Sequence, residues 1–249
     1  MKAERKPHHG AGAMADFTVE TLAEDALLLR FGDGIDMATN ARVHATAKVL
    51  RHANLSGISD IAPAYATLLV RFDPLAWDGD TVGETIIKTL DPGFRRDDEQ
   101  KPSKRDVSRV VEIPVCYGDE CGPDIDAVAE HAGLSREKVI ARHAAAEYTV
   151  AMLGFAPGFP YLLGLDAALH VPRRATPRTR VPAGSVAIGG AQTGIYPREL
   201  PGGWHLIGRT PLALFDPARK PPCLLAPGDH VRFRAIDADE FARFADRDT

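Results

Sequence analysis

A stretch over residues 148–227, rich in Gly and Pro, constrains the fold more than any other part of the sequence. Short apolar runs are separated there by Gly and Pro at intervals too brief for helices, a rhythm typical of a small, strongly bent β-barrel. Polar and aromatic side chains crowd the same turns. Because loops carry unusual side chains mostly where something binds, we expect a ligand site in this stretch.

Composition argues against several classes of protein. The chain has 249 residues, 45% hydrophobic and 26% charged, with a net charge of −4. These values suit a globular protein of two domains and give no reason to expect a nucleic-acid partner. No apolar run approaches the ~20 residues of a membrane span, and residues 1–15 lack the apolar core of a secretion signal. We therefore expect a cytoplasmic protein without a membrane partner.

The cysteines predict neither disulfides nor a metal site. Cys116, Cys121 and Cys223 are an odd and sparse set, which argues against a disulfide framework. The spacing of the first two is wrong for the usual zinc half-site, and no His pair at ligand spacing follows. We expect structural thiols and no bound metal.

The first half of the chain predicts an α+β domain over residues 17–93. Residues 1–16 are short of bulky apolar side chains and are expected to be a disordered extension, with Met14 as an alternative start. Thr81 and Glu84 have the spacing of a capping box at the start of a helix. An antiparallel sheet covered by two helices on one face gives a domain of ferredoxin-like size. The expected elements are strands at 17–20 and 26–31, a helix at 36–53, strands at 57–61 and 65–72, and a helix from about 81 to 90.

Residues 94–108 are charged and are predicted to be a linker, which leaves 109–249 as the barrel domain. Ser135 is the expected N-cap of a helix that ends near residue 146. Residues 237–240 are expected to cap a last short helix. The other expected elements are a helix at 124–132 and strands at 109–115, 148–155, 185–188, 204–207, 212–215 and 230–236.

Familiar catalytic signatures are missing. Residues 189–194 satisfy the glycine spacing of a P-loop, but Ile195 and Tyr196 stand where that loop needs Lys and Ser or Thr. Nucleophile-elbow, zinc-protease and dinucleotide-binding motifs are also absent. Glycines at 154, 158, 184, 189, 194, 202 and 203 are expected to supply positive φ at turns and bulges.

Many residues at fixed spacing nevertheless resemble one family, the B subunit of prokaryotic 5-oxoprolinase, also known as KipI or allophanate hydrolase subunit 1. The resemblance covers about residues 17–236 and is dense after 113. Its motifs are Ile113-Pro-Val-Cys-Tyr-Gly118, Gly122-Pro-Asp124, Glu147-Tyr148, Leu153-Gly-Phe-x-Pro-Gly-Phe-Pro-Tyr161, Thr176-Pro-Arg178, Val181-Pro-Ala-Gly-Ser185, Gln192-Thr-Gly194, Pro201-Gly-Gly-Trp204, Leu206-Ile-Gly208 and Leu214-Phe-Asp-Pro217.

The resemblance implies a cyclophilin-like β-barrel for the second half of the chain. It also implies work beside a KipA-like C subunit and a LamB/YcsF-type A subunit, in the ATP-driven opening of 5-oxoproline to glutamate. ATP, with Mg, would be a co-substrate of the complex. Two other interpretations stay open: a regulatory protein that inhibits a histidine kinase, and a role in urea-derived amide metabolism.

Three residues are expected to be catalytic. His143 and Glu147 lie four apart near a helix end, so they can face the same side, and either could act as a general base. A structural pair is the alternative, and Ala144 stands where the family usually has Ser. Arg209, together with Arg178 and Arg180, could offer forked donors to phosphate or carboxylate.

The remaining candidates are expected to bind substrate at the barrel rim. Trp204 and His205 are strand neighbours, so we expect them to point to opposite faces. An exposed rim with several large aromatics is costly unless a partner covers it, so we expect a site shared with the C subunit. Core packing is the alternative for the aromatic residues. The predicted substrate-binding residues are Phe155, Phe159, Tyr161, Arg178, Arg180, Gln192, Thr193, Tyr196, Trp204 and His205.

Overall fold

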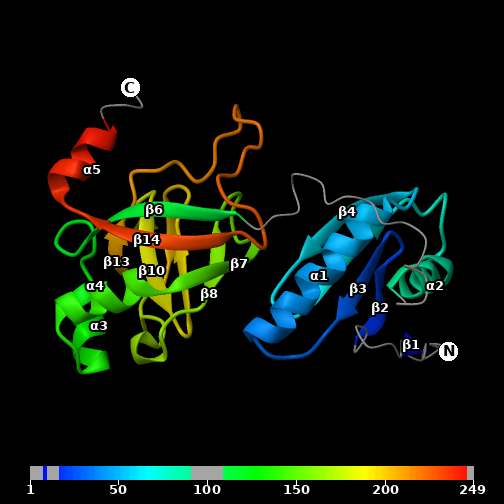
Figure 1. The fold of residues 1–249 in the computed structure, drawn as a ribbon, viewed down its shortest axis with the longest axis horizontal. Helices are drawn as coiled ribbons and strands as arrows, with labels where there is room; N and C mark the ends of the chain where they lie inside the picture. Colours follow the sequence, from blue (N-terminus) through cyan, green and yellow to red (C-terminus); the bar gives the residue numbers. More distant parts are fainter. Residues whose placement is uncertain (1–7, 10–16, 91–108, 246–249) are drawn as a thin grey trace. The chain divides into compact units, whose positions relative to one another are not determined.

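The computed structural model describes residues 8–9, 17–90 and 109–245 and divides the chain into two compact units, Met1–Val107 and Ser108–Thr249 (Figure 1). The predicted charged linker lies outside the described residues, as does the predicted disordered extension except for two positions. Those two, His8–His9, form the short strand β1, antiparallel to β2. The edge of β2 offers unpaired backbone groups to such a further strand. The disordered extension over residues 1–16 stays a prediction.

The first unit is an antiparallel sheet covered by two helices. The sheet has the order β1-β2-β3-β5-β4, and its apolar face packs against both helices in one core cluster. The prediction of two helices on one face of an antiparallel sheet is confirmed. The bounds are β2 (Thr18–Ala23), β3 (Ala26–Arg30), α1 (Met37–Ala53), β4 (Ile58–Pro63), β5 (Thr67–Phe72) and α2 (Gly79–Leu90).

An aspartate side chain caps the start of each of the two helices. In α1 the Asp36 carboxylate accepts a hydrogen bond from the Thr39 amide at 2.8 Å, which satisfies one of the free donors of the first turn. In α2 the cap is Asp78, which accepts from the amide of Thr81 at 2.8 Å. The sequence places the cap at Thr81 itself. The helix begins two residues earlier because Asp78 caps as well as Thr does and lies further upstream.

The second unit is a closed β-barrel of seven strands in the order β10-β11-β8-β7-β14-β6-β13 (Figure 1). Strands β14 and β6 pair in parallel and the other neighbours are antiparallel. A closed barrel leaves no edge strand exposed. The bounds are β6 (Val110–Tyr117), β7 (Glu147–Leu153), β8 (Pro160–Leu163), β10 (Ser185–Gly189), β11 (Gln192–Ile195), β13 (His205–Arg209) and β14 (His230–Ile236).

The barrel interior holds one apolar core to which every barrel strand contributes. Side chains alternate between the two faces of a strand, so these contributors face one another inside the barrel. Helices α3 (Ile125–Ala132) and α4 (Arg136–Ala145) pack on the same core, and Ser135 caps α4 as predicted. One contributor from each strand is Ile113, Val150, Leu162, Val186, Ile195, Ile207 and Val231.

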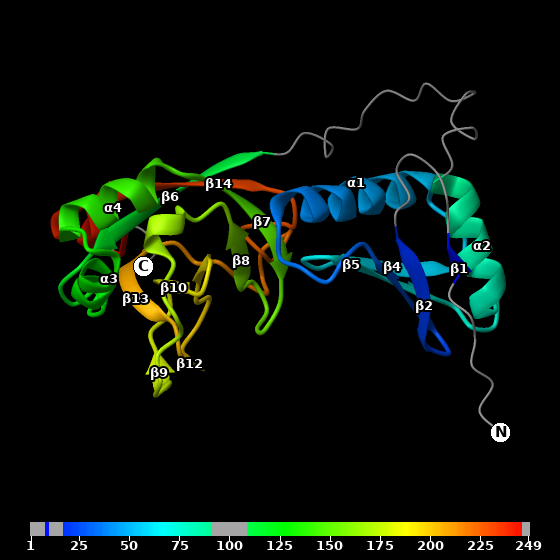
Figure 2. The same cartoon turned by 90° about the horizontal axis from the view of Figure 1, so that it is seen from below.

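Outside the barrel, β9 (Arg178–Val181) and β12 (Leu200–Gly202) form a separate two-stranded sheet that projects from one side (Figure 2). Helix α5 (Ala238–Ala245) ends the described chain, with Asp237 accepting from the Glu240 amide as expected. None of the described helices is long and apolar enough to cross a membrane.

The sequence-based prediction differs from the structure in the Gly- and Pro-rich part. Residues 212–215 do not form a strand. Phe215 makes only an isolated bridge to Cys223. Gly194, expected to lie at a turn or bulge, belongs with Gln192 and Thr193 to β11, and the turn is formed by residues 190 and 191. The sequence does not predict strands β8, β9, β11 and β12, because each has only three or four residues and most contain Pro or Gly.

Candidate functional site

The candidate site lies on the outer face of the barrel wall made by β8, β10, β11 and β13. On β11, Ile195 belongs to the interior core, whereas its neighbour Tyr196 belongs to a separate cluster on the other face. Ile207 and Leu206 divide in the same way on β13. We call this second group the outer-face cluster. It contains Ala156, Phe159, Val181, Ala187, Tyr196, Trp204 and Leu206, with Tyr161 and Leu200 packed against it.

Three glycines make room for the rings of the outer-face cluster. A Cβ at Gly189 would lie 2.6 Å from the Trp204 indole, and one at Gly202 would lie 2.1 Å from the Tyr196 hydroxyl oxygen. A Cβ at Gly194 would lie 3.1 Å from the Phe159 ring. None of these three glycines has a positive φ, so their predicted role as turn residues is wrong. Of the seven glycines expected to have positive φ, only 158 and 184 do.

The aromatic rings pack edge to face, and most of them are buried. Phe159 lies 5.2 Å from Tyr196 and 5.9 Å from Trp204 between ring centroids, both in T-shaped contacts that aromatic pairs prefer. Phe159, Tyr196 and Trp204 are buried and Tyr161 is half-buried. The expectation of an exposed aromatic rim is therefore wrong for these residues, because the β9–β12 sheet and the 154–159 loop cover the rings.

Phe155 is the exception. Its side chain is 60% exposed, and its φ of +66° lies in the left-handed region that a bulky residue adopts only under strain. The ring stands in a T-shaped contact 5.5 Å from Phe159. Strained residues of this kind gather at binding sites, and a large exposed aromatic ring is a frequent anchor for a ligand or partner.

Beside the outer-face cluster lies a buried carboxylate that two arginines share. Asp124 is bound by both terminal nitrogens of Arg178, at 2.7 and 2.8 Å, and by Arg174 at 2.8 Å. It also accepts from the Leu206 amide on β13 at 2.8 Å. Burial raises the pKa of the Asp124 carboxyl, but the hydrogen bonds from Arg178 and Leu206 and the two positive charges outweigh burial and lower it overall. The Arg178 fork thus binds a carboxylate of its own chain rather than a phosphate.

Arg173 lies over the outer-face cluster and is not singled out by the sequence. Its guanidinium carbon stands 5.8 Å from the centre of the Trp204 ring, within cation–π range. Among the described residues, no carboxylate forms an ion pair with Arg173. Arg173 follows a proline and precedes another arginine, a pattern that does not distinguish a site residue from a surface one. In the sequence, Asp124 is visible only as part of the Gly122-Pro-Asp124 motif.

Gln192 lies on the outer face of β11, two residues before Gly194 and four before Tyr196. The side chain is only 7% exposed, and its amide nitrogen has no hydrogen-bond partner in the part of the chain that the structure describes. A buried donor without an acceptor is costly, and such groups in native proteins call for an explanation. Thr193 points the other way, into the barrel.

The other predicted substrate-binding residues are placed as follows. His205 is half-buried on the strand between Trp204 and Leu206, and its Nε2 lies 3.0 Å from the Pro172 carbonyl oxygen, to which it donates. Arg180 is exposed and binds Glu199 at 2.8 Å. The Arg180 guanidinium is thus paired with a carboxylate of its own chain, whereas Nδ1 of His205 has no hydrogen-bond partner among the described residues.

His143 is at the centre of a hydrogen-bond network inside the barrel. The Tyr117 hydroxyl lies 2.8 Å from Nδ1, and Nε2 lies 3.0 Å from the Thr193 hydroxyl, which itself donates to the Ala187 carbonyl oxygen. Because the Thr193 proton is already directed to Ala187, Nε2 carries the imidazole proton and Tyr117 donates to Nδ1. Burial lowers the pKa of His143 from 6.5 to about 3, so the ring is neutral at physiological pH.

Glu147 and His143 do not share a helix. Helix α4 ends at Ala145, so Glu147 begins β7 and its exposed carboxylate binds Arg232 at 2.5 Å. The expectation that the two residues face the same side is wrong, because it assumes a continuous helix. Arg209 ends β13, at the opposite end of that strand from Trp204, and its Nε donates to the Ala183 carbonyl oxygen at 2.9 Å. The structure does not gather the three predicted catalytic residues at one point.

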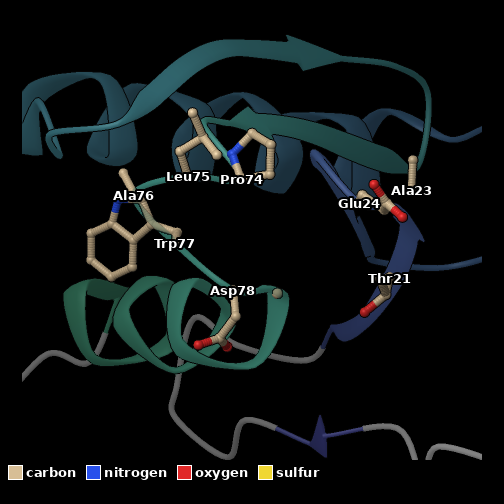
Figure 3. A pocket seen from close by; sticks show the side chains of 9 residues that line it. Thr21, Ala23, Glu24, Pro74, Leu75, Ala76, Trp77 and Asp78 are labelled. Carbon is tan, nitrogen blue, oxygen red and sulfur yellow. The ribbon is translucent and has the colours of Figure 1, made fainter.

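The first unit carries an open cavity of about 550 Å³ between the β2–β3 turn and the loop that leads into α2 (Figure 3). Glu24 and Thr21 lie on one side, and Pro74 and Leu75 on the other. Asp78, at its floor, already caps α2. No predicted site residue lines this cavity, so it does not contribute to the candidate site.

Comparisons with known proteins agree with the resemblance. Residues 17–225 match the family model described as carboxyltransferase domain, subdomain C and D. The chain is 42% identical to the 5-oxoprolinase B subunit of Bacillus subtilis, over 90% of this chain and 95% of that protein. It is also 42% identical to the 5-oxoprolinase B subunit of Escherichia coli O157:H7, over 85% of this chain and 93% of that protein.

Solved structures show the same fold inside longer proteins. The crystal structure of TTHA0988 matches with a TM-score of 0.72 and 41% identity over 86% of this chain, which spans only 40% of the TTHA0988 chain. The Kluyveromyces lactis urea amidolyase matches with a TM-score of 0.72 at 20% identity and covers 96% of this chain, which spans 16% of that protein. The second likeness concerns the fold alone.

The family model and the full-length relatives agree with the motifs on which the resemblance rests. The chain belongs to the carboxyltransferase subdomain C and D family and, within it, to the B subunits of 5-oxoprolinase.

Proposed function

We propose that the chain is the B subunit of an ATP-dependent 5-oxoprolinase that converts 5-oxo-L-proline to L-glutamate in the cytoplasm, together with C and A subunits. The observation that carries this proposal is the 42% identity over 95% of the Bacillus subtilis relative. The Kluyveromyces lactis urea amidolyase is only 20% identical to this chain, so its similar fold does not favour urea chemistry.

The chemistry explains why ATP is required. The lactam of 5-oxoproline is a resonance-stabilised amide and a poor electrophile. Transfer of the γ-phosphoryl group to the carbonyl oxygen makes the carbon a good electrophile. One water then adds to that carbon and the ring C–N bond breaks, with the nitrogen leaving as the amine, to give an acyl phosphate. A second water hydrolyses the acyl phosphate to the carboxylate and phosphate. Phosphoryl transfer needs positioning and charge stabilisation more than covalent machinery, which several subunits can supply jointly, with Mg on the nucleotide.

For this chain we propose a part in binding the substrate rather than in holding the nucleotide. Gly189 and Gly194 belong to the β10–β11 hairpin, with Gly189 paired to Gln192, whereas a P-loop joins a strand to a helix and needs a Lys. The proposed substrate-binding residues are those of the outer face: Phe155, Phe159, Tyr161, Gln192, Tyr196 and Trp204. Phe155 and Arg209 are proposed to face the C subunit.

We also propose a fold family for each of the two units. The barrel is proposed to be cyclophilin-like, as the resemblance implies. The first unit is proposed to be ferredoxin-like, because β3-α1-β4-β5-α2 follows the βαββα part of that order and β2 pairs with β3 where the final strand would.

Complementation tests the function directly. We expect the chain to restore growth on 5-oxoproline as sole nitrogen source to a bacterium that lacks its own B subunit but keeps the other two. Growth on ammonium is the control for viability. If the folded chain is present at normal level and growth fails, while the native B subunit restores it, the proposed function is wrong.

A further inference from the structure

Arg173 is held in place by the residues on both sides of it. The Pro172 carbonyl oxygen accepts from His205 at 3.0 Å, and the Arg174 amide donates to the Gly203 carbonyl oxygen at 2.7 Å. The Arg174 side chain binds Asp124 at 2.8 Å. The backbone of Arg173 is thus tied to the segment that carries Trp204, which lowers the backbone entropy lost when a ligand binds.

The charge of Arg173 is not compensated by its own chain. The other arginines nearby in the sequence do have carboxylate partners, since Arg174 and Arg178 share Asp124 and Arg180 binds Glu199. Among the described residues, no carboxylate oxygen lies within 4.0 Å of an Arg173 nitrogen. An exposed guanidinium without an ion-pair partner among the described residues is suited to bind a carboxylate, because its fork of N–H donors matches the two carboxylate oxygens.

Gln192 adds a second polar function at the same face. Its partner across the β10–β11 hairpin is Gly189, the residue over which the Trp204 ring packs. The unpaired amide nitrogen of Gln192 is therefore on the β10–β11 hairpin, which packs against the Trp204 ring. Arg173 lies over the same ring. A ligand oxygen that reached this nitrogen would satisfy a donor that has no acceptor among the described residues of the free chain. The nitrogen is covered, so a side-chain rotation must accompany binding.

We propose that Arg173 and Gln192 recognise a cyclic amide that carries a carboxylate, with Arg173 binding the carboxylate and Gln192 donating to the ring carbonyl oxygen. This assignment deepens the proposed function and rests on it. It gives the two ends of the substrate different partners, so it predicts selection against rings that lack either the carboxylate or the carbonyl group.

The first test uses the assembled complex with its C and A subunits. Arg173→Ala should raise the KM for 5-oxoproline at least about tenfold, as loss of a charge-assisted pair implies. The KM for ATP and the kcat should change much less. Arg173→Lys keeps the charge but not the fork and should recover part of the loss. Arg198→Ala, which removes another arginine of the same unit, is the control and should leave the KM unchanged. A normal KM in Arg173→Ala overturns the proposal.

The second test separates this inference from the proposed function. The full chain alone is titrated with 5-oxoproline, proline and 2-pyrrolidinone, and Trp fluorescence is followed, with Trp77→Phe as background so that Trp204 is the reporter. We expect saturable binding of 5-oxoproline, weaker binding of the other two, and loss of binding in Arg173→Ala and Gln192→Ala. Binding with these losses supports the inference even if the complex proves to have another activity. Binding that persists in both variants overturns it, as does the absence of binding by both the chain and the complex.

Discussion

His143 shows how burial determines what a titratable residue can do. Its pKa falls from 6.5 to about 3 because burial removes the water that would stabilise a charged imidazole, and its nearest polar groups are the hydroxyls of Tyr117 and Thr193. A neutral ring with both nitrogens bonded acts as a connector between α4 and β11. The geometry therefore favours a structural role for the residue that the sequence suggests as a base.

This burial predicts a pH dependence of stability. Between pH 6.5 and about 3 the unfolded chain binds a proton at His143 and the folded chain does not, so the free energy of unfolding decreases as pH falls below 6.5. Above pH 6.5 the residue contributes no pH dependence. From pH 7 to 5.5 the wild type should lose about 1 kcal/mol more than His143→Gln in urea unfolding. Equal losses in the two proteins would contradict the buried neutral state.

The contact between Gly189 and Trp204 gives a second prediction at this scale. A methyl group at Gly189 would overlap the indole, so Gly189→Ala should lower the free energy of unfolding by about 1–3 kcal/mol. Gly203→Ala is the matched control, because the nearest atom to its added Cβ is 3.6 Å away and its cost should be within about 0.5 kcal/mol. Thermal melting compares the two. If they melt together, the ring does not pack over Gly189 as described.

At the scale of elements, Asp124 joins the start of α3, the β9 strand and β13. Asp124→Asn leaves two partly buried guanidinium groups without their carboxylate and should cost roughly 3 kcal/mol. Glu199→Gln removes the exposed partner of Arg180 and should cost under about 1 kcal/mol. Because the pKa of Asp124 is lowered in the folded chain, its contribution is present above pH ~4 and is lost as pH falls through the folded value. Denaturant unfolding of the two variants at pH 7 measures the difference.

The elements that can be predicted from sequence are those with a regular pattern. Strand β14 is predicted with its observed bounds because its apolar residues alternate along the strand, and α1 because its apolar residues recur at helical spacing. The short strands that build the site have no such pattern. The ion pair between Asp124 and Arg178 joins residues 54 positions apart, so no local sequence pattern can predict it.

At the scale of the whole molecule, the chain divides into two units near residue 107. The charged stretch at 95–106 lacks apolar side chains that could tie it down, so we expect limited proteolysis to cut there first. Mass spectrometry of the first fragments locates the cut. First cleavage within residues 154–208, with 95–106 intact, would show that the barrel loops are less protected than their packing implies.

We propose that this chain works only as one subunit of a lactam-opening complex. The most direct measurement is ADP release dependent on 5-oxoproline, with the purified chain alone, with the C and A subunits alone, and with all three together. We expect glutamate and ADP to form in equal amounts in the complete mixture and background release in the other two. Turnover by the repurified chain alone, or a complete complex that hydrolyses ATP without any response to 5-oxoproline, would contradict the claim.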